Sequence, residues 1–210
     1  MRAAAALEVK GLTKSYGGKQ IFSSLSFTIS SGETVGLLGR NGTGKTTLLQ
    51  ILAGLLKPDA GEIQYFGQKI PRGSAALSKV CGYLPQENPL LMELSVQDNL
   101  SLFTGRSGRP AENLISMFHL EDILKTPVKR LSGGMKRRVS ICASVCLGQP
   151  LLLMDEPTAA LDMEVKREIR EWLLQYKKLG GTLLIATHDE EEIRALDRCL
   201  KLESGSIIPL

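Results

Sequence analysis

The chain has 210 residues, and its 26 Lys and Arg against 22 Asp and Glu leave a formal net charge of only +4. Hydrophobic residues make up 43% and charged residues 23%, which excludes a disordered chain, and the small charge argues against a nucleic-acid coat. The 21 glycines exceed the usual level of about 7%, and no repeat accounts for them. The densest basic cluster is interpreted as the solvated face of a helix: Lys136, Arg137 and Arg138.

The cysteines and the apolar runs indicate the compartment of the chain. The four cysteines contain no CxxC pair, so we expect free or buried thiols in a reducing environment. The apolar runs fall far short of the roughly 20 residues that span a bilayer, and residues 1–8 are too few for a signal-peptide core. We therefore expect a cytoplasmic chain that needs a partner for any work at a membrane.

The first third of the chain predicts strands around one helix. Residues 7–9 and 21–29 alternate apolar and polar side chains, which predicts strands of an antiparallel sheet. Residues 34–38 form a compact apolar strand that ends in a glycine-rich turn. Apolar residues at helical spacing predict a helix over 46–55, and a further strand is expected over 62–66.

The rest of the chain predicts a mainly parallel α/β core that helices interrupt. The expected elements are helices over 96–103, 111–118 and 132–147, a strand over 151–154, a helix over 164–179 and a strand over 183–186. An apolar strand, a helix and a second apolar strand are typical of a parallel sheet. We therefore expect one domain, in which residues 1–87 and 148–210 form the core with its antiparallel β subdomain and residues 88–147 form an inserted helical subdomain.

A phosphate-binding pattern lies between the strand over 34–38 and the helix that follows. Residues 39–46 match GxxxxGK followed by Ser or Thr, in which glycines let backbone N–H groups surround phosphate oxygens at a helix N-terminus. Lys45 would bridge the outer phosphates, and the Thr46 hydroxyl would ligate Mg²⁺. A plain glycine turn is the less favoured interpretation. The nucleotide-binding residues are expected to be Gly39, Arg40, Asn41, Gly42, Thr43, Gly44, Lys45, Thr46 and Thr47.

Two acidic residues follow the apolar strand over 151–154. Asp155 would lie at the carboxyl end of the sheet, where ligands of such folds bind, and would hold the metal directly or through water. Glu156 can face the terminal phosphate and accept a proton from attacking water. An acidic pair after a strand is often structural, but the phosphate loop upstream favours the functional interpretation.

Residues 131–135, Leu-Ser-Gly-Gly-Met, open the last helix before that strand. Ser132 is an N-cap by residue type. Gly133 and Gly134 would weaken the first turn by about 1 kcal/mol each relative to Ala, which is useful where helix N–H groups face an anion. The residues alone leave an anion site and a capped turn equally open.

Taken in order along nearly the whole chain, these segments resemble the ATP-binding cassette (ABC) ATPases. Residues 39–46 match the Walker A loop, residues 131–135 the LSGG signature and residues 151–156 the Walker B strand. The LSGG motif carries the most weight because it is nearly private to this family. The resemblance also identifies the tyrosine that stacks on adenine, the Q-loop glutamine, the D-loop and the switch histidine as Tyr16, Gln86, residues 160–162 and His188.

The resemblance implies a P-loop NTPase fold of the ABC type and a head-to-tail dimer that encloses two ATP molecules. Ser132, Gly133 and Gly134 of one copy would contact the γ-phosphate that the other copy holds. Glu156 would act as the general base, and His188 would sense the γ-phosphate. The intact set of motifs implies that a homodimer would have two competent sites, although a degenerate partner stays open.

The same resemblance assigns the remaining site residues. Thr46, Gln86 and Asp155 would surround the Mg²⁺ ion. Gln86 would also link the metal and the nucleotide to a membrane subunit. Lys45 would act on the transferred phosphate, and Asp162 would cross the dimer interface.

The chain departs from the family pattern at two positions of the signature helix. Met135 follows LSGG where many members have Gln, and Ala143 stands where many have Arg. The spacing between signature and Walker B is as expected, so we expect hydrolysis to persist. The run Gly-Gly-Met-Lys-Arg-Arg is similar to the exporter-associated branch. Because 22 residues follow His188, sugar-importer types, which have long carboxyl-terminal extensions, are less favoured.

The favoured function is the ATP-hydrolysing subunit of a transporter, most similar to exporters, whose membrane-spanning permease subunits are separate chains. Such a subunit would lie on the inner face of the cell membrane and would bind no nucleic acid. A non-transport ABC ATPase acting on ribosomes or DNA is the alternative, and the absence of a second cassette and of long coiled coils disfavours it. A small-molecule P-loop kinase is disfavoured by LSGG and His188.

Overall fold

The computed structural model describes residues 4–104 and 112–209, so the N-terminal residues 1–3 and the first residue of the helix predicted over 111–118 lie outside the described part. Two long strands, β1 (Ala5–Tyr16) and β2 (Lys19–Ser30), form an antiparallel hairpin. Gly17 and Gly18 form its turn with φ angles of 53° and 81°, the conformation that a two-residue type I′ turn requires. β4 (Ala60–Tyr65) pairs with the other edge of β1. The predicted antiparallel sheet is confirmed, with longer strands than expected.

The second sheet has six strands and carries the site. Its order is β5-β6-β7-β3-β8-β9, and its strands are parallel except for the antiparallel pair β8 and β9. The strands β3 (Thr34–Leu38), β6 (Leu151–Asp155) and β7 (Thr182–Ala186) match the prediction closely. Three strands were not expected from the sequence: β5 (Cys81–Leu84), β8 (Arg198–Glu203) and β9 (Ser206–Pro209).

The parallel strands are buried on both faces, which explains their continuous apolar sequence. Leu151 and Leu153 of β6 pack into the cluster formed with α1 (Lys45–Leu52) and the antiparallel sheet. Leu152 and Met154 pack into the cluster formed with α5 (Gly133–Val145) and α6 (Met163–Lys178) on the opposite face. Because side chains alternate along a strand, Asp155 lies on the same face as Leu151 and Leu153, toward α1.

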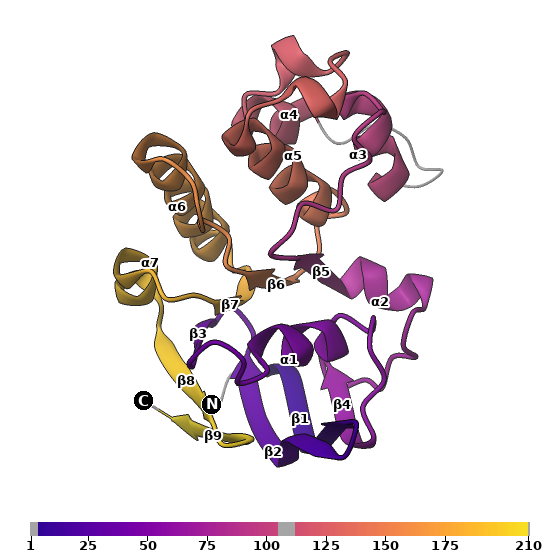
Figure 1. Cartoon of the computed structure of the whole chain (residues 1–210), viewed down its shortest axis with the longest axis vertical. Helices are drawn as coiled ribbons and strands as arrows, with labels where there is room; N and C mark the ends of the chain where they lie inside the picture. Colours follow the sequence, from indigo (N-terminus) through magenta and orange to yellow (C-terminus); the bar gives the residue numbers. More distant parts are fainter. Residues whose placement is uncertain (1–3, 105–111, 210) are drawn as a thin grey trace.

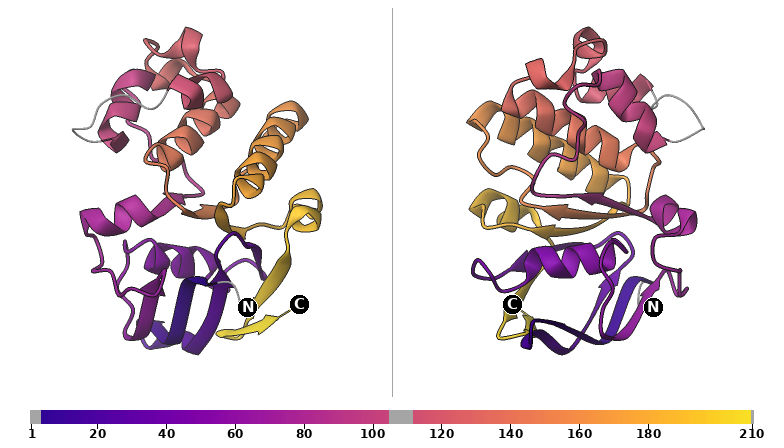
Figure 2. Two further views of the ribbon diagram at one scale, coloured as in Figure 1. Left: turned by 180° about the vertical axis from the view of Figure 1, so that it is seen from behind. Right: turned by 45° about the vertical axis from the view of Figure 1, so that its right-hand side comes forward.

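The helices between β5 and β6 gather at one end of the molecule, away from the antiparallel sheet (Figures 1 and 2). They are α3 (Val96–Thr104), α4 (Glu112–Met117) and α5, joined by the 3₁₀ turns η2 (Glu121–Ile123) and η3 (Val128–Arg130). Two further short helices were not predicted, α2 (Ala75–Val80) and α7 (Glu190–Ala195), and the side chains of Ser74 and Asp189 cap them. Within residues 4–104 and 112–209, no helix has the length and apolar character to cross a bilayer.

Candidate functional site

The phosphate loop joins the end of β3 to the start of α1, as the sequence predicted, and two of its glycines are fixed by close packing. A Cβ on Gly39 would lie 2.7 Å from the carbonyl oxygen of Leu202. Gly44 has a φ of 103°, and a Cβ there would lie 2.6 Å from Cγ2 of Ile21. Gly42, with a φ of 81°, meets open space instead. The loop is therefore closely packed at its two ends, Gly39 and Gly44, and the backbone around Gly42 is open to a ligand.

The Lys45 side chain lies over this loop. Its Nζ donates to the carbonyl oxygen of Gly39 at 2.8 Å and to that of Arg40 at 3.4 Å. The Thr43 hydroxyl donates to the same Arg40 oxygen at 2.9 Å, which closes the turn. Both of these partners are neutral carbonyl groups, which do not neutralise an ammonium, so an anion in the loop can pair with Lys45.

Asp155 ends β6 directly beside the first residues of α1. The residue is 1% exposed, and its Oδ2 has no hydrogen-bond partner among the described residues. Burial raises the pKa of this carboxyl, while the Thr46 hydroxyl, the Lys45 ammonium and the Arg137 guanidinium act to lower it. An unpaired buried oxygen costs about 1–3 kcal/mol, which a bound cation would offset. Carboxylate, hydroxyl and amide oxygens are also the ligands that Mg²⁺ prefers, so the residues present fit this ion.

Glu156 leaves the line of the strand. Its φ is 48°, a left-handed conformation that costs a non-glycine residue on the order of 1 kcal/mol or more. Its N–H donates to the Ala186 carbonyl oxygen at 2.8 Å, which holds the segment after β6 against β7. Nδ1 of His188 lies 2.9 Å from each oxygen of the Glu156 carboxylate. The glutamate side chain is 11% exposed and the histidine side chain 79%, so the pair reaches from the site to the surface.

These groups surround one open cavity of about 360 Å³, a volume typical of small-molecule sites. The cavity combines the phosphate loop, the end of β6 and the segment after β5. Its lining residues are Ile21, Asn41, Gly42, Gly44, Lys45, Thr46, Thr47, Gln86, Asp155 and Glu156. The structure therefore brings together, from three separate segments, about half of the residues that the sequence assigned to nucleotide and metal. Ile21 of β2 is an addition that no motif indicated.

Several other predicted site residues lie elsewhere in the chain. Tyr16 is at the end of the β1–β2 hairpin, 46% exposed, with the Lys14 ammonium 5.0 Å from its ring centroid. Ser132, Gly133 and Gly134 begin α5 in the helical part of the chain. Asp162 caps α6, its carboxylate accepting from the N–H of Val165 at 3.0 Å. None of these residues lines the cavity, so their predicted contacts with ATP stay predictions.

The start of α5 shows what each signature residue does within a single chain. The Ser132 hydroxyl accepts from the N–H of Met135 at 3.2 Å, so the capped turn is present. A Cβ on Gly134 would lie 2.9 Å from Cγ2 of Val165, so close packing of α5 on α6 requires this glycine. A Cβ on Gly133 would meet nothing within 4 Å. Packing within this chain therefore does not explain why residue 133 is a glycine.

Sequence reasoning was wrong about one residue of the basic cluster. Arg137 is 4% exposed and lies inside the molecule, where burial lowers the pKa of its guanidinium to about 10. It donates to backbone carbonyl groups at the ends of β5 and β6. Arg138 is also held, by Glu168 of α6, while Lys136 is partly exposed. No sequence pattern indicated that Arg137 is buried. Three consecutive basic residues normally face water, and nothing in the sequence distinguishes Arg137 from its two neighbours.

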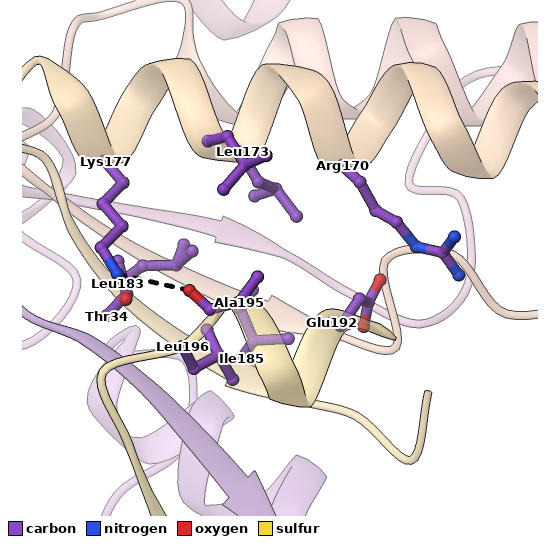
Figure 3. Close-up of a pocket in the computed structure, with 10 residues that line it drawn as sticks. Thr34, Arg170, Leu173, Lys177, Leu183, Ile185, Glu192, Ala195 and Leu196 are labelled. Atoms are coloured by element: carbon purple, nitrogen blue, oxygen red, sulfur yellow. Dashed lines mark hydrogen bonds between the residues drawn. The ribbon is translucent and has the colours of Figure 1, made fainter. Parts of the chain in front are cut away.

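A separate, small cavity of about 30 Å³ lies between α6 and α7 (Figure 3). Leu173, Ile185 and Leu196 are among its apolar lining residues, and Arg170 and Glu192 lie at one end of it. Oε1 of Glu192 accepts from the Thr158 hydroxyl at 2.7 Å, and burial raises the pKa of this carboxyl. The cavity has room for about one water molecule and takes no part in the phosphate site.

We expect Mg²⁺-dependent nucleotide binding to weaken as the pH falls through the raised pKa of Asp155. A protonated carboxyl cannot ligate the metal, so the loss should begin at a higher pH than the ordinary aspartate pKa of 3.8 would give. Asp155→Asn should weaken Mg²⁺ binding and remove the part of its pH dependence that comes from protonation of Asp155. Mg²⁺ titrations with a fluorescent ATP analogue, from about pH 5 to pH 7.5, measure both effects. Titration of the nucleotide contributes equally to the wild type and to Asp155→Asn. Identical pH profiles of Mg²⁺ binding in the two proteins would therefore contradict the assignment of Asp155 as a metal ligand.

The comparisons with known proteins agree with this geometry. A family model described as ABC transporter matches residues 22–159. Nod factor export ATP-binding protein I of Rhizobium etli is 37% identical over 211 residues, which cover 97% of this chain and 67% of that protein. The corresponding protein of Sinorhizobium fredii is 39% identical over 209 residues, 95% of this chain and 61% of that protein. The chain thus spans about two thirds of the length of these relatives.

Solved structures show the same fold. An ATP-binding cassette captured as a dimer in a post-hydrolysis state, with ADP and Pi bound, superposes with a TM-score of 0.85 at 27% identity, covering 96% of each chain. CbiO1 of Clostridium perfringens, part of the ABC transporter complex CbiONQ, superposes with a TM-score of 0.83 at 30% identity, covering 98% of this chain and 87% of that one. With its phosphate loop, acidic pair and signature helix in the family's order, the chain belongs to the ABC transporter family and is an ATP-hydrolysing cassette of it.

Proposed function

We propose that two copies of this cassette enclose two ATP molecules and power the export of a substrate through separate membrane-spanning subunits. The observation that carries the proposal is the division of the chain into two half-sites. One is the cavity with its phosphate loop and acids, and the other is the signature turn, which lies outside that cavity. A second copy placed head to tail would bring the two together. Export is supported by the relatives, which are named as export ATP-binding proteins.

Within the cavity, each lining group has a role that its position supports. Lys45 and the N–H groups of residues 39–46 bind the phosphates. Thr46, Asp155 and Gln86 would hold Mg²⁺, which when bound neutralises charge on the phosphate oxygens. Glu156 accepts the proton of the attacking water, because this residue lines the cavity beside the phosphate loop. His188 orients that carboxylate through its Nδ1 contact and would meet the γ-phosphate.

Across the dimer, the signature residues of one copy would complete the site of the other. Ser132, Gly133 and Gly134 would present the N-terminal N–H groups of α5 to the γ-phosphate. Asp162 would lie near the interface, and Tyr16 would stack on adenine. We further propose that residues 88–147 move as a subdomain against the core of residues 1–87 and 148–210.

The two glycines of the signature should respond differently to alanine. Gly134→Ala should destabilise the fold by about 1–3 kcal/mol, because the methyl group would press on Val165. Gly133→Ala should keep or slightly raise stability, because alanine favours the helix and the space is open. The same Gly133 variant should lower ATP turnover roughly tenfold or more, because its methyl group would hold a phosphate away from the helix N–H groups. Thermal unfolding and phosphate-release rates measure the two effects, and full turnover by Gly133→Ala would contradict the shared site.

The membrane partner is expected to dock beside the segment that carries Gln86. Leu91 and Met92 follow this segment and are both exposed large apolar side chains. A partner covering them would connect the membrane subunit to a metal-site residue. The cassette would then lie at the cytoplasmic face of the membrane.

The test is to measure how cell fractions change ATP turnover and what co-purifies with the tagged chain. Stimulation by membrane vesicles, together with capture of a polytopic membrane protein, would support the transporter. Leu91→Glu should abolish that stimulation while leaving the basal rate unchanged. Stimulation by ribosomes or DNA in place of vesicles would overturn the proposal and favour the non-transport alternative.

A further inference from the structure

Arg137 places a buried guanidinium between the two segments that carry the acids and the glutamine of the site. Nε donates to the Pro157 carbonyl oxygen at 2.8 Å. Nη1 donates to the carbonyl oxygens of Pro85 at 2.8 Å and Gln86 at 3.2 Å. Nη2 donates to those of Asp155 at 3.1 Å and Glu156 at 2.8 Å. The acceptors are all backbone carbonyl groups.

These contacts use the whole hydrogen-bonding capacity of the side chain. A guanidinium has five N–H donors in a rigid planar fork, and five donor–acceptor contacts are present. A charge this deeply buried is tolerated only where its donors are satisfied. The negative charges of Asp155, Glu192 and Glu156 also stabilise the charged guanidinium through space. Lysine, with three donors on a single nitrogen, cannot reproduce this fork.

The acceptors belong to two segments that leave the sheet side by side. β5 and β6 are paired parallel strands, so the segments that follow them emerge at the same edge. One segment carries Gln86 and the other carries Asp155 and Glu156. Carbonyl groups on both sides of Glu156 point at the guanidinium, which holds this residue in its strained conformation at φ 48°. The orientation of the Glu156 carboxylate therefore depends on Arg137.

Arg137 also belongs to the signature helix. It lies four residues after Gly133, a rise of about 6 Å along α5. A shift of α5 must therefore move the guanidinium relative to the segments after β5 and β6, or carry them with it. In this way the first turn of α5 and the Glu156 carboxylate of the same chain are mechanically linked.

We propose that Arg137 is a positioning residue for ATP hydrolysis, which sets Glu156 and Gln86 relative to each other and couples both to the signature helix. The proposal rests on the proposed function, because it needs Glu156 to be the general base. It assigns to Arg137 an effect on the chemical step and none on the binding of ATP to the phosphate loop. The residue touches neither the cavity nor the reacting atoms, so it acts only through the backbone that it holds.

The test compares Arg137→Lys with Arg138→Lys in the full chain. Arg138 is the neighbouring arginine of α5, and its partner is the carboxylate of Glu168, which lysine can also pair with. Arg137→Lys should lower kcat about 10–100-fold, in line with the cost of a small misplacement of a catalytic group. The Kd for an ATP analogue should change less than about twofold, and Arg138→Lys should leave both quantities near wild type.

A double-mutant cycle with Glu156→Gln separates positioning from general damage. If Arg137 acts through Glu156, adding Arg137→Lys to Glu156→Gln should lower turnover by much less than it does alone. Equal losses in both backgrounds, or parallel losses of kcat and ATP affinity, would show a structural role and overturn the proposal. Unchanged kcat in Arg137→Lys would overturn it as well. Near-normal turnover of Glu156→Gln alone would instead refute the proposed base.

Arg137→Gln provides a second variant if the lysine variant fails to fold. It removes the charge and keeps one amide donor group. Near-ultraviolet circular dichroism and thermal unfolding establish the folded fraction, and kcat is expressed per folded molecule. The same loss of kcat at unchanged ATP affinity is expected, and full activity per folded molecule would overturn the proposal.

Discussion

Glu156→Gln should lower ATP turnover by roughly 10²–10⁴-fold while ATP still binds, which is the usual share of general acid–base catalysis. Glutamine has the shape of glutamate and can stay beside His188, but it cannot take a proton from water. Glu156 lines the cavity at the carboxyl end of β6, where the attacking water would lie. With hydrolysis blocked, ATP should persist between two copies and hold a dimer together.

The measurement combines a phosphate-release assay with size-exclusion chromatography in the presence of ATP and Mg²⁺. A dimer peak that depends on ATP and appears in Glu156→Gln is the expected result. Glu62→Gln is a matched control, because Glu62 is an exposed glutamate that pairs with Lys69 on the antiparallel sheet. Turnover near the wild-type rate would show that another group takes the proton.

Lys45→Ala should weaken nucleotide binding about 10–100-fold, because a charge-assisted hydrogen bond contributes roughly 1.5–3 kcal/mol. The ammonium lies over the loop, where its hydrogen-bond partners among the described residues are two neutral carbonyl oxygens, so it is available to the outer phosphates. Its loss also removes the contacts that tie Lys45 to Gly39 and Arg40. Turnover at saturating ATP should fall too, because the transferred phosphate would be poorly placed.

Titration with a fluorescent ATP analogue measures the change in Kd. Lys57→Ala is the control, because Lys57 is an exposed lysine in the turn that follows α1 and lies outside the cavity. Its affinity for the analogue should match that of the wild type. Unchanged affinity in Lys45→Ala would remove the basis for placing phosphates in this loop.

Elements that depend on local pattern were predicted well from the sequence. The strands β3, β6 and β7 are buried on both faces, so a short apolar run is enough to identify each of them. The amphipathic helices α5 and α6 were also predicted, with ends one or two residues away from the observed ones. The missed elements lack such a pattern. β8 (Arg-Cys-Leu-Lys-Leu-Glu) neither alternates strictly nor forms a continuous apolar run, β5 has four residues, and α2 and α7 have six each.

The candidate site likewise combines features that a local sequence pattern predicts with contacts that only the fold creates. A phosphate loop is made of consecutive residues, so its sequence specifies its shape through glycine conformations and the helix that follows. The acids at the end of β6 were predicted from their position directly after a short apolar run. The contact of Glu156 with His188 joins residues 32 positions apart, and the contacts of Arg137 reach residues up to 52 positions away. Such pairings depend on the packing of strands that no local pattern specifies.

The sequence by itself determined the phosphate loop, the acidic pair, the signature turn and the fold class, because each depends on backbone conformation or side-chain period over a few neighbouring residues. Only the tertiary structure decided that Gly134 is needed for packing while Gly133 is free, and that Arg137 is buried between the two catalytic segments. The physical reason is that burial and hydrogen bonding are set by whatever residues the fold brings into contact. A glycine or an arginine looks the same in the sequence whether it faces water, another helix or the backbone of an active site.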